Sequence, residues 1–389
     1  MTSFIHTADW QLGKPFSRVA DPDRQANLRR QRLESLDRIG DVARQQQASF
    51  VVVAGDVFDS HRPPDRLVSL ALERIGRLGL PVYIIPGNHD YGGPGSLWES
   101  EHFQRENREL APNLTVLLAA EPVDRDDAIL LPCPLLRRQQ LNDPTEWIRQ
   151  FDFTGCDDRP RIVLAHGSTL NFRQDGDEED GGRQANFIEL DRLPLAEIDY
   201  LALGDWHGMV QAGDKAWYSG SHETDRFPKE GQRTGHVAVV DVRRGGSPVV
   251  EPVQTGHTRW LEYPATFATD AGPAALKEAL EQLVGDAERR LSLLKLSLSG
   301  SLGLAGHAEL AAVLEEWQAA LLDLRRDGSV AVAPTADEIA ALVHTTANPL
   351  IAHVAGQLQS QIEGGGEDAA LAGTAIALLH EFAKAGDTI

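Results

Sequence analysis

The chain has 389 residues, with 58 acidic and 37 basic side chains and a formal net charge of -21. This charge excludes a protein that holds nucleic acid by its bulk charge alone, because phosphate binding needs a locally positive surface. Hydrophobic residues make up 42% of the chain and charged residues 24%. This composition is typical of a soluble globular protein.

The cysteines and the N-terminal sequence bear on the cellular compartment. Cys133 and Cys156 are the two cysteines, which are too few for a disulfide framework and lie far from each other in sequence. The first residues contain no basic segment followed by an apolar run, and no stretch approaches 18 uninterrupted apolar residues. We therefore expect a cytoplasmic protein without a membrane span.

The first two thirds of the chain alternate short apolar runs with amphipathic stretches. The pattern predicts strands at residues 4–8, 50–54 and 82–85 and helices at residues 23–47 and 66–78. Further strands are predicted at residues 115–118, 128–131, 161–165, 200–203, 217–218, 236–242 and 249–253. We expect an α/β fold in which two sheets form a sandwich flanked by helices. An acidic run at residues 175–180 is typical of a solvated loop.

The sequence becomes rich in alanine and leucine after about residue 262. Here the pattern predicts a helix at 274–290, a strand at 294–298, a helix at 307–324 and more helix after residue 334. Thr335 and Glu338 form a capping box at the start of that last part. We expect a large domain at 1–262, a smaller α+β segment at 263–333 and a helical region at 334–389.

Polar residues that can bind metals follow five of the predicted strands. They are Asp9 and Gln11; Asp56 and Asp59; Asn88, His89 and Asp90; His166; and Asp205 and His207. Ligands of open α/β sheets bind at the edge formed by the carboxyl ends of the strands. Two divalent cations held there by a shared carboxylate can clamp a phosphoryl group and activate a water molecule, with a histidine as general acid. The sequence therefore predicts a metal-dependent phosphoesterase.

These motifs resemble, in order, the five-motif signature of the calcineurin-like metallophosphoesterases, over residues 3–255. Within that family, FIHTADWQLG, GDVFD and GNHD, together with the strand at Tyr218–Ser221, resemble the DNA repair exonuclease branch, the SbcD- and YhaO-type nuclease subunits. The resemblance implies a metal-dependent exonuclease that acts on DNA beside a coiled-coil ATPase of the SbcC type. It also implies a possible homodimer, with the region after residue 265 shaping the approach of DNA and carrying the helices that dock on the ATPase.

The resemblance also implies a role for each site residue. Asp56 would bridge two cations, of which the first is also held by Asp9, Gln11 and His207 and the second by Asn88, His166 and Asp205. His89 would act on the leaving group, and Asp90 would orient and charge the His89 ring.

The chain departs from the family at Gln11 and Asp205, where the family usually has histidine. Oxygen ligands favour manganese or magnesium, and we expect manganese. Asp205 adds a negative charge to the second site, whereas the neutral amide of Gln11 is a poor ligand. We therefore expect two cations, with the first bound more weakly.

Other residues have alternative interpretations. We expect a buried structural role for His6, packing roles for Trp10 and Trp206, and an exposed helix face for the arginines at 24, 29, 30 and 32. His222 and Arg226 could lie at the rim of the site. Two other functions stay open: a phosphoesterase for nucleotides or other small substrates, and a scaffold whose metal centre has drifted.

Overall fold

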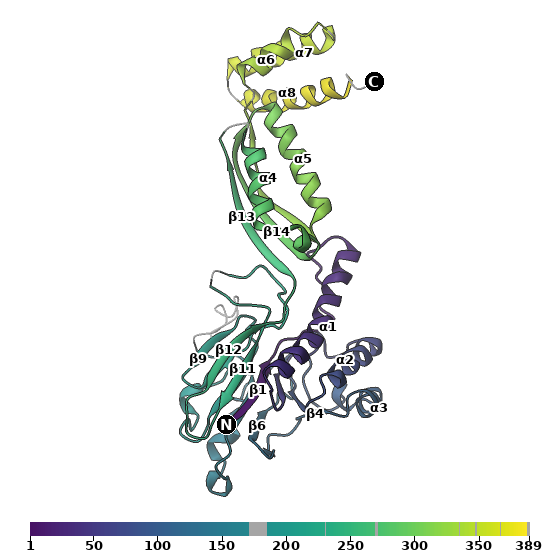
Figure 1. Cartoon of the computed structure of the whole chain (residues 1–389). Helices are drawn as coiled ribbons and strands as arrows, with labels where there is room; N and C mark the ends of the chain where they lie inside the picture. The colour runs from purple at the N-terminus through teal and green to yellow at the C-terminus, as the bar shows by residue number, and fades with distance from the viewer. Residues whose placement is uncertain are drawn as a thin grey trace. The chain divides into compact units, whose positions relative to one another are not determined.

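The computed structural model describes residues 1–170, 185–229, 231–268, 271–333, 335–346, 348–365 and 367–386, so the predicted acidic loop lies outside the described residues. The chain divides into two compact units, Met1–Thr258 and Arg259–Ile389 (Figure 1). The boundary expected after residue 262 falls inside strand β13 (Arg259–Phe267). This strand pairs along its whole length with β14 (Ser292–Leu302) and therefore belongs to the second unit.

The first unit contains two six-stranded mixed sheets. The first sheet has the order β12-β11-β1-β2-β3-β4, in which the neighbours from β1 to β4 are parallel and β11 and β12 are antiparallel. Its strands are β1 (Thr2–Thr7), β2 (Val51–Ala54), β3 (Val82–Ile85), β4 (Leu114–Val116), β11 (His236–Val242) and β12 (Val249–Gln254). Every one of these strands overlaps a strand predicted from the sequence.

The second sheet has the order β5-β6-β7-β8-β10-β9, in which the neighbours from β6 to β10 are parallel and the two outer strands are antiparallel. Its strands are β5 (Val123–Asp124), β6 (Ile129–Cys133), β7 (Arg161–His166), β8 (Tyr200–Gly204), β9 (Val210–Gly213) and β10 (Ala216–Tyr218). Both sheets therefore present the carboxyl ends of several parallel strands.

The two sheets pack face to face through alternate residues of their strands. Phe4 and Val52 of the first sheet and Ile162 and Leu164 of the second belong to one buried cluster. The residues between them, such as Ile5 and Val53, point to the opposite face and pack against helices. These helices are α1 (Pro22–Gln45), α2 (Asp65–Arg77) and α3 (Glu101–Leu110), which lie together beside the first sheet (Figure 1). The predicted sandwich flanked by helices is confirmed, although α3 was not predicted.

The second unit is a smaller α+β structure, as expected. Its sheet joins β13, β14, β15 (Asp323–Gly328) and β16 (Ala331–Val332), and α4 (Gly272–Leu283) and α5 (Leu304–Ala320) pack on it through a separate core. The helix predicted at 307–324 was too long, because Asp323 and Leu324 lie in β15. Three further helices follow: α6 (Ala336–Val343), α7 (Pro349–Gly364) and α8 (Glu367–Gly386). Helix α6 begins at the predicted capping box.

None of the described helices is both long and apolar enough to cross a membrane.

Arg32 on α1 is buried, which corrects the expectation that this arginine faces solvent. Its side chain is 1% exposed, and its guanidinium donates hydrogen bonds of 2.7–2.9 Å to the backbone carbonyls of Asp9, Trp10 and Glu223. The segment that follows β1 lies outside the named helices and strands. Its buried backbone carbonyls therefore need hydrogen-bond donors from side chains. Arg32 therefore holds the backbone that carries Asp9.

We expect Arg32→Met to lower the free energy of unfolding by about 3 kcal/mol, because several buried carbonyls would lose their donor. Urea denaturation followed by fluorescence measures the change. Arg30→Met is the matched control on the same helix, because the Arg30 side chain is 61% exposed. It should change stability by no more than about 0.5 kcal/mol. Equal effects of the two substitutions would contradict the structural role of Arg32.

Candidate metal centre

The carboxylates of the candidate centre lie in the turns that directly follow β1, β2 and β8. Asp9, Asp56 and Asp205 have φ angles of 53°, 58° and 98°, in a region that residues other than glycine rarely adopt. Backbone hydrogen bonds hold two of these turns together, from Asp9 N to Gly55 O at 3.1 Å and from Gln11 N to Asp56 O at 2.8 Å. Unusual backbone conformations of this kind concentrate at functional sites.

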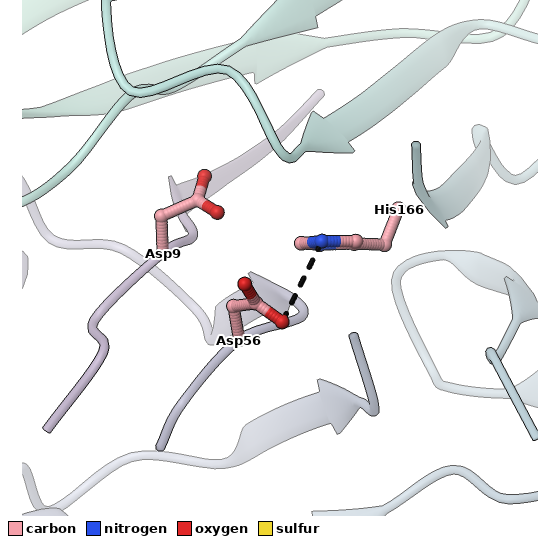
Figure 2. Close-up of side chains that lie close together, drawn as sticks. All are labelled: Asp9, Asp56 and His166. Carbon is pink, nitrogen blue, oxygen red and sulfur yellow. Dashed lines mark ion pairs between the residues drawn. The ribbon is translucent and has the colours of Figure 1, made fainter. Parts of the chain in front are cut away.

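Asp9, Asp56 and His166 form a compact buried cluster (Figure 2). One possible ligand atom from each lies within 4.8 Å of the others, and the three residues are 0–2% exposed. Asp9 and Asp56 come from the first sheet and His166 comes from the second, and the three side chains point toward one another (Figure 2). The carboxyl ends of the two sheets therefore meet at one site.

His166 is oriented by the backbone of the opposite sheet. Its Nδ1 lies 2.7 Å from the carbonyl oxygen of Ala54, which can only accept, so Nδ1 carries a proton. The other nitrogen, Nε2, faces the carboxylates, 3.6 Å from Asp56 Oδ1 and 3.8 Å from Asp205 Oδ1. A histidine ligand of a metal commonly has its second nitrogen fixed in this way.

Two buried polar atoms at the centre have no hydrogen-bond partner among the described residues. They are His166 Nε2 and Asn88 Oδ1. Buried polar atoms are nearly always paired, and two potential ligand atoms left over beside buried carboxylates form the arrangement that a cation would complete. We call Asp56, Asn88, His166 and Asp205 the second half-site. Its residues fit a divalent cation.

Asp205 is held at this half-site by its neighbours. Its backbone N–H donates to the carboxylate oxygens of Asp9 at 3.2 and 3.1 Å, and its Oδ2 accepts from Ser168 Oγ at 3.0 Å. The structure thus brings Asp205, which departs from the family pattern, to the expected place.

Glycines allow the close approach of these turns. A Cβ atom at Gly87 would lie 2.2 Å from Asp56 Oδ1, and one at Gly55 would lie 2.3 Å from His166 Nδ1. Gly55 also has a φ of 92°. Glycine is therefore required beside the metal motifs, and a side chain here would displace the ligands.

We call Gln11 and His207, together with Asp9 and Asp56, the first half-site. Gln11 Nε2 lies 3.5 Å from Asp56 Oδ2 and 3.2 Å from His207 Nε2. The other nitrogen of His207, Nδ1, lies 2.9 Å from the buried Asp225 Oδ2. The Gln11 amide nitrogen therefore lies between Asp56 and His207.

Lys14 and Asp225 were not identified from the sequence. Lys14 Nζ donates to Gln11 Oε1 at 2.8 Å and to Asp225 Oδ2 at 2.6 Å. Lys14 follows Gln11 by three residues, which is a weak signal, whereas nothing local in the sequence connects Asp225 to this site.

His89 and Asp90 differ in their surroundings. His89 N donates to Asp56 Oδ1 at 2.9 Å, its Nδ1 lies 2.9 Å from the carbonyl oxygen of Asp59, and its Nε2 lies 3.9 Å from Asp56 Oδ2. Asp90 accepts instead from the backbone N–H groups of Gly87 and Phe58, at 2.8 and 3.0 Å. The expected role of Asp90 in orienting the His89 ring is therefore wrong, because the Asp59 carbonyl takes that position. Asp90 holds the turn that carries Asn88 and His89.

The metal-free centre binds protons more strongly than isolated side chains do. Burial raises the pKa of Asp9 to about 6 and that of Asp90 to about 7. Burial opposes the charged form of His166, but the carboxylates of Asp56, Asp9 and Asp205 outweigh it and raise the pKa of His166 to about 9.

A pocket of about 330 Å³ lies beside the centre. The residues that line it are Gln11, His89, Asp205 and His207 of the site; the cations Lys14, Arg226 and Lys229; the acid Asp59; the aromatic residues Trp206 and Phe227; and Gly208 and Gln232. Although the whole chain is acidic, this pocket offers positive charge next to the buried carboxylates.

The remaining candidates have structural roles. His6 is fully buried with its Nδ1 2.9 Å from Tyr200 Oη, and Trp10 is fully buried with its Nε1 donating to Thr7 Oγ1 at 2.9 Å. Both expectations are confirmed. His222 is buried against the carbonyl oxygen of Arg32, whereas Arg226 Nη2 reaches His207 Nδ1 at 2.9 Å. Of this pair, Arg226 lies at the site.

Residues 2–240 match the calcineurin-like phosphoesterase family, and the chain belongs to this family. It is 26% identical over 276 residues to a protein of Bacillus subtilis (strain 168) that is named as a subunit of the nuclease SbcCD, over 62% of this chain and 66% of that protein. The chain thus spans slightly less than two thirds of that relative. The solved structure of TT1561 of Thermus thermophilus is 12% identical, with a TM-score of 0.39 over 65% of this chain and 99% of that one. A second solved structure is 14% identical, with a TM-score of 0.39 over 64% of this chain and 98% of that one.

We expect cation binding to release protons, because ligands must lose them to bind a metal. At about pH 7 the proton comes mainly from His166, whose pKa is raised to about 9, with a smaller part from Asp9, whose pKa is raised to about 6. The affinity for Mn²⁺ should therefore rise from about pH 6 to about pH 9, by up to about tenfold per pH unit for each proton released. Calorimetric titration in two buffers of different ionisation enthalpy measures the protons released. Binding heats that are equal in the two buffers would show that no proton is released and would contradict the raised pKa of His166 and Asp9.

Proposed function

We propose that this chain is a metal-dependent phosphodiesterase that hydrolyses DNA, an exonuclease of DNA repair that works in the cytoplasm. The observation that carries the proposal is the buried Asp9–Asp56–His166 cluster, which lies next to a pocket lined by Lys14, Arg226 and Lys229. The name of the Bacillus relative supports a nuclease within this family.

The proposed cofactor is a pair of divalent cations, manganese or magnesium. Asp56 would be shared, Asn88, His166 and Asp205 would complete the second half-site, and Asp9, Gln11 and His207 would complete the first. Carboxylate and amide oxygens support these hard cations. When bound, they polarise the phosphate oxygens and lower the pKa of a water molecule, so that no side-chain nucleophile is required.

The side chains of the pocket have separate tasks in this proposal. Nδ1–H of His89 donates to the Asp59 carbonyl, which fixes the ring and leaves Nε2 facing the centre. From this position a protonated Nε2 donates its proton to the leaving oxygen. Lys14, Arg226 and Lys229 attract the DNA phosphates. Trp206 and Phe227 line the same pocket, although Trp206 also packs against the core of the second sheet.

A coiled-coil ATPase of the SbcC type is the proposed partner, and a homodimer is a further expectation. The relative is named as a subunit, which supports an assembly. On helices α7 and α8, the side chains of Leu350, Leu371 and Phe382 are 70–72% exposed. Exposed apolar side chains support a docking role for these helices. The net charge of -21 implies that the chain alone holds DNA weakly.

The test of the proposed function is hydrolysis of linear duplex DNA, single-stranded DNA and an aryl phosphodiester by the purified chain with Mn²⁺. We expect cleavage of DNA. Asp56→Asn should abolish it, because the shared ligand loses its charge. Cleavage of the aryl ester alone would favour the small-substrate phosphoesterase, and no hydrolysis of any substrate would favour the scaffold.

His89→Ala should reduce the rate of DNA cleavage by about 10²–10⁴-fold, the usual contribution of a general acid. Mn²⁺ binding, followed by calorimetry, should persist in this variant. His257→Ala, at an exposed histidine, is the control and should retain full activity. A His89→Ala protein with an unchanged rate would remove His89 from the mechanism.

A further inference from the structure

The first half-site contains a hydrogen-bond network that the family resemblance does not imply. Gln11 Nε2 lies between Asp56 Oδ2 and His207 Nε2, at 3.5 and 3.2 Å. These two atoms are the ligand atoms that a first cation would need. In the described geometry, an N–H donor of the chain itself therefore uses the lone pairs that the cation would use.

Lys14 determines which end of the Gln11 amide faces those atoms. A lysine ammonium can only donate, so its 2.8 Å contact must be with the amide oxygen. The amide nitrogen is then directed toward Asp56 and His207. The Gln11 backbone is fixed as well, because its N–H donates to Asp56 O and its φ is 39°.

Asp225 keeps both Lys14 and His207 in this arrangement. Its carboxylate is fully buried, and its Oδ2 lies 2.6 Å from Lys14 Nζ and 2.9 Å from His207 Nδ1. Arg226 Nη2 also lies 2.9 Å from His207 Nδ1. In the tautomer whose Nδ1–H donates to Asp225, Nε2 of a neutral His207 is an acceptor, which matches the Gln11 N–H that faces it. Gln11, Lys14, Asp225 and His207 are thus joined in one hydrogen-bond network.

The second half-site contrasts with this network. His166 Nε2 and Asn88 Oδ1 have no hydrogen-bond partner among the described residues. A cation at the second half-site therefore displaces no hydrogen bond of these two atoms. A cation at the first half-site must displace the Gln11 amide, and it also meets the positive charge of Lys14 close by.

We propose that Lys14, acting through Gln11, competes with the first cation, so that the centre binds its two cations in order and with unequal affinity. The second half-site fills first. The first half-site fills after the amide of Gln11 turns away from Asp56 and His207, which breaks the Lys14–Gln11 hydrogen bond. Lys14 is thus a positioning residue that makes full loading of the centre depend on cation concentration.

This inference deepens the proposed function because it concerns the same centre, but its test needs no substrate. Mn²⁺ is titrated into the metal-free chain by calorimetry, and electron paramagnetic resonance distinguishes an isolated Mn²⁺ from an exchange-coupled pair. For the wild type we expect two binding events, in which one Mn²⁺ binds tightly and the other weakly. At one equivalent of Mn²⁺ the resonance spectrum should be that of an isolated Mn²⁺. Two events of equal affinity, or a coupled pair already at one equivalent, would overturn the proposal. Absence of nuclease activity with these two events intact would instead count against the proposed function.

Lys14→Met should tighten the weak event by at least about tenfold, because a hydrogen bond to a charged group and a nearby positive charge are both removed. Arg226→Met is the matched control for charge. Arg226 also contacts His207 and Asp225, but among the described residues no hydrogen bond joins it to Gln11. It should tighten the weak event by less than about threefold, since its side chain is 56% exposed. Equal effects of the two substitutions would reduce the role of Lys14 to its charge and overturn the proposal.

Gln11→His keeps the Lys14–Asp225 ion pair and tests the network a second time, should Lys14→Met lower the melting temperature. An imidazole has no carbonyl oxygen to hold Lys14, and it supplies a nitrogen ligand. We expect the two affinities in this variant to approach each other. A weak event that stays as weak as in the wild type would show that Gln11 does not limit the first half-site.

Discussion

The hydrogen bond from His166 Nδ1–H to the carbonyl of Ala54 joins the two sheets where their parallel strands end. Its donor ends β7 in the second sheet, and its acceptor ends β2 in the first, at 2.7 Å. Asp56 follows Ala54 after one glycine, so this bond also sets the distance between the imidazole and the central carboxylate. The metal centre therefore depends on how closely the sheets approach at this point, which Gly55 and Gly87 permit.

Assembling this centre is unfavourable for the protein alone. The buried carboxylates of Asp9 and Asp56 and the 10% exposed carboxylate of Asp205 follow different strands and lie near one another, and all three residues have a positive φ. Burial and mutual repulsion raise the pKa of Asp9 and of Asp205 in the metal-free chain. A cation that binds only the folded state offsets the cost of burying these carboxylates close together, and it stabilises the fold by mass action. Arg32 contributes from the other side, since it holds the backbone of Asp9 without adding a side chain to the site.

The strand ends could be predicted from the sequence because local patterns decide them. Apolar β-branched runs such as Val51–Ala54, each closed by glycine and a carboxylate, identify both the strand and the edge at which its ligand lies. The burial of Arg32 could not be predicted, because an arginine on a helix looks the same in sequence whether it meets solvent or buried carbonyls. The same holds for Asp225, which reaches His207 only through tertiary packing, and for Asp90, whose adjacency to His89 suggested a contact that the Asp59 carbonyl makes instead. In the second unit, the end of the helix predicted at 307–324 was missed because Leu321, Leu322 and Leu324 continue the apolar pattern past the last helical residue, Ala320.

The net charge of -21 is compatible with the proposed action on DNA, because some of the acidic side chains surround the cation site. A bound metal ion would reverse the sign of the charge there. We expect the joined strand ends to bind a divalent cation. The most direct measurement is anomalous diffraction at the manganese edge from crystals of the chain grown with Mn²⁺. We expect a peak within bonding distance of Asp56, His166, Asn88 and Asp205. A map with no peak at these residues, at a manganese concentration that saturates binding in solution, would contradict it.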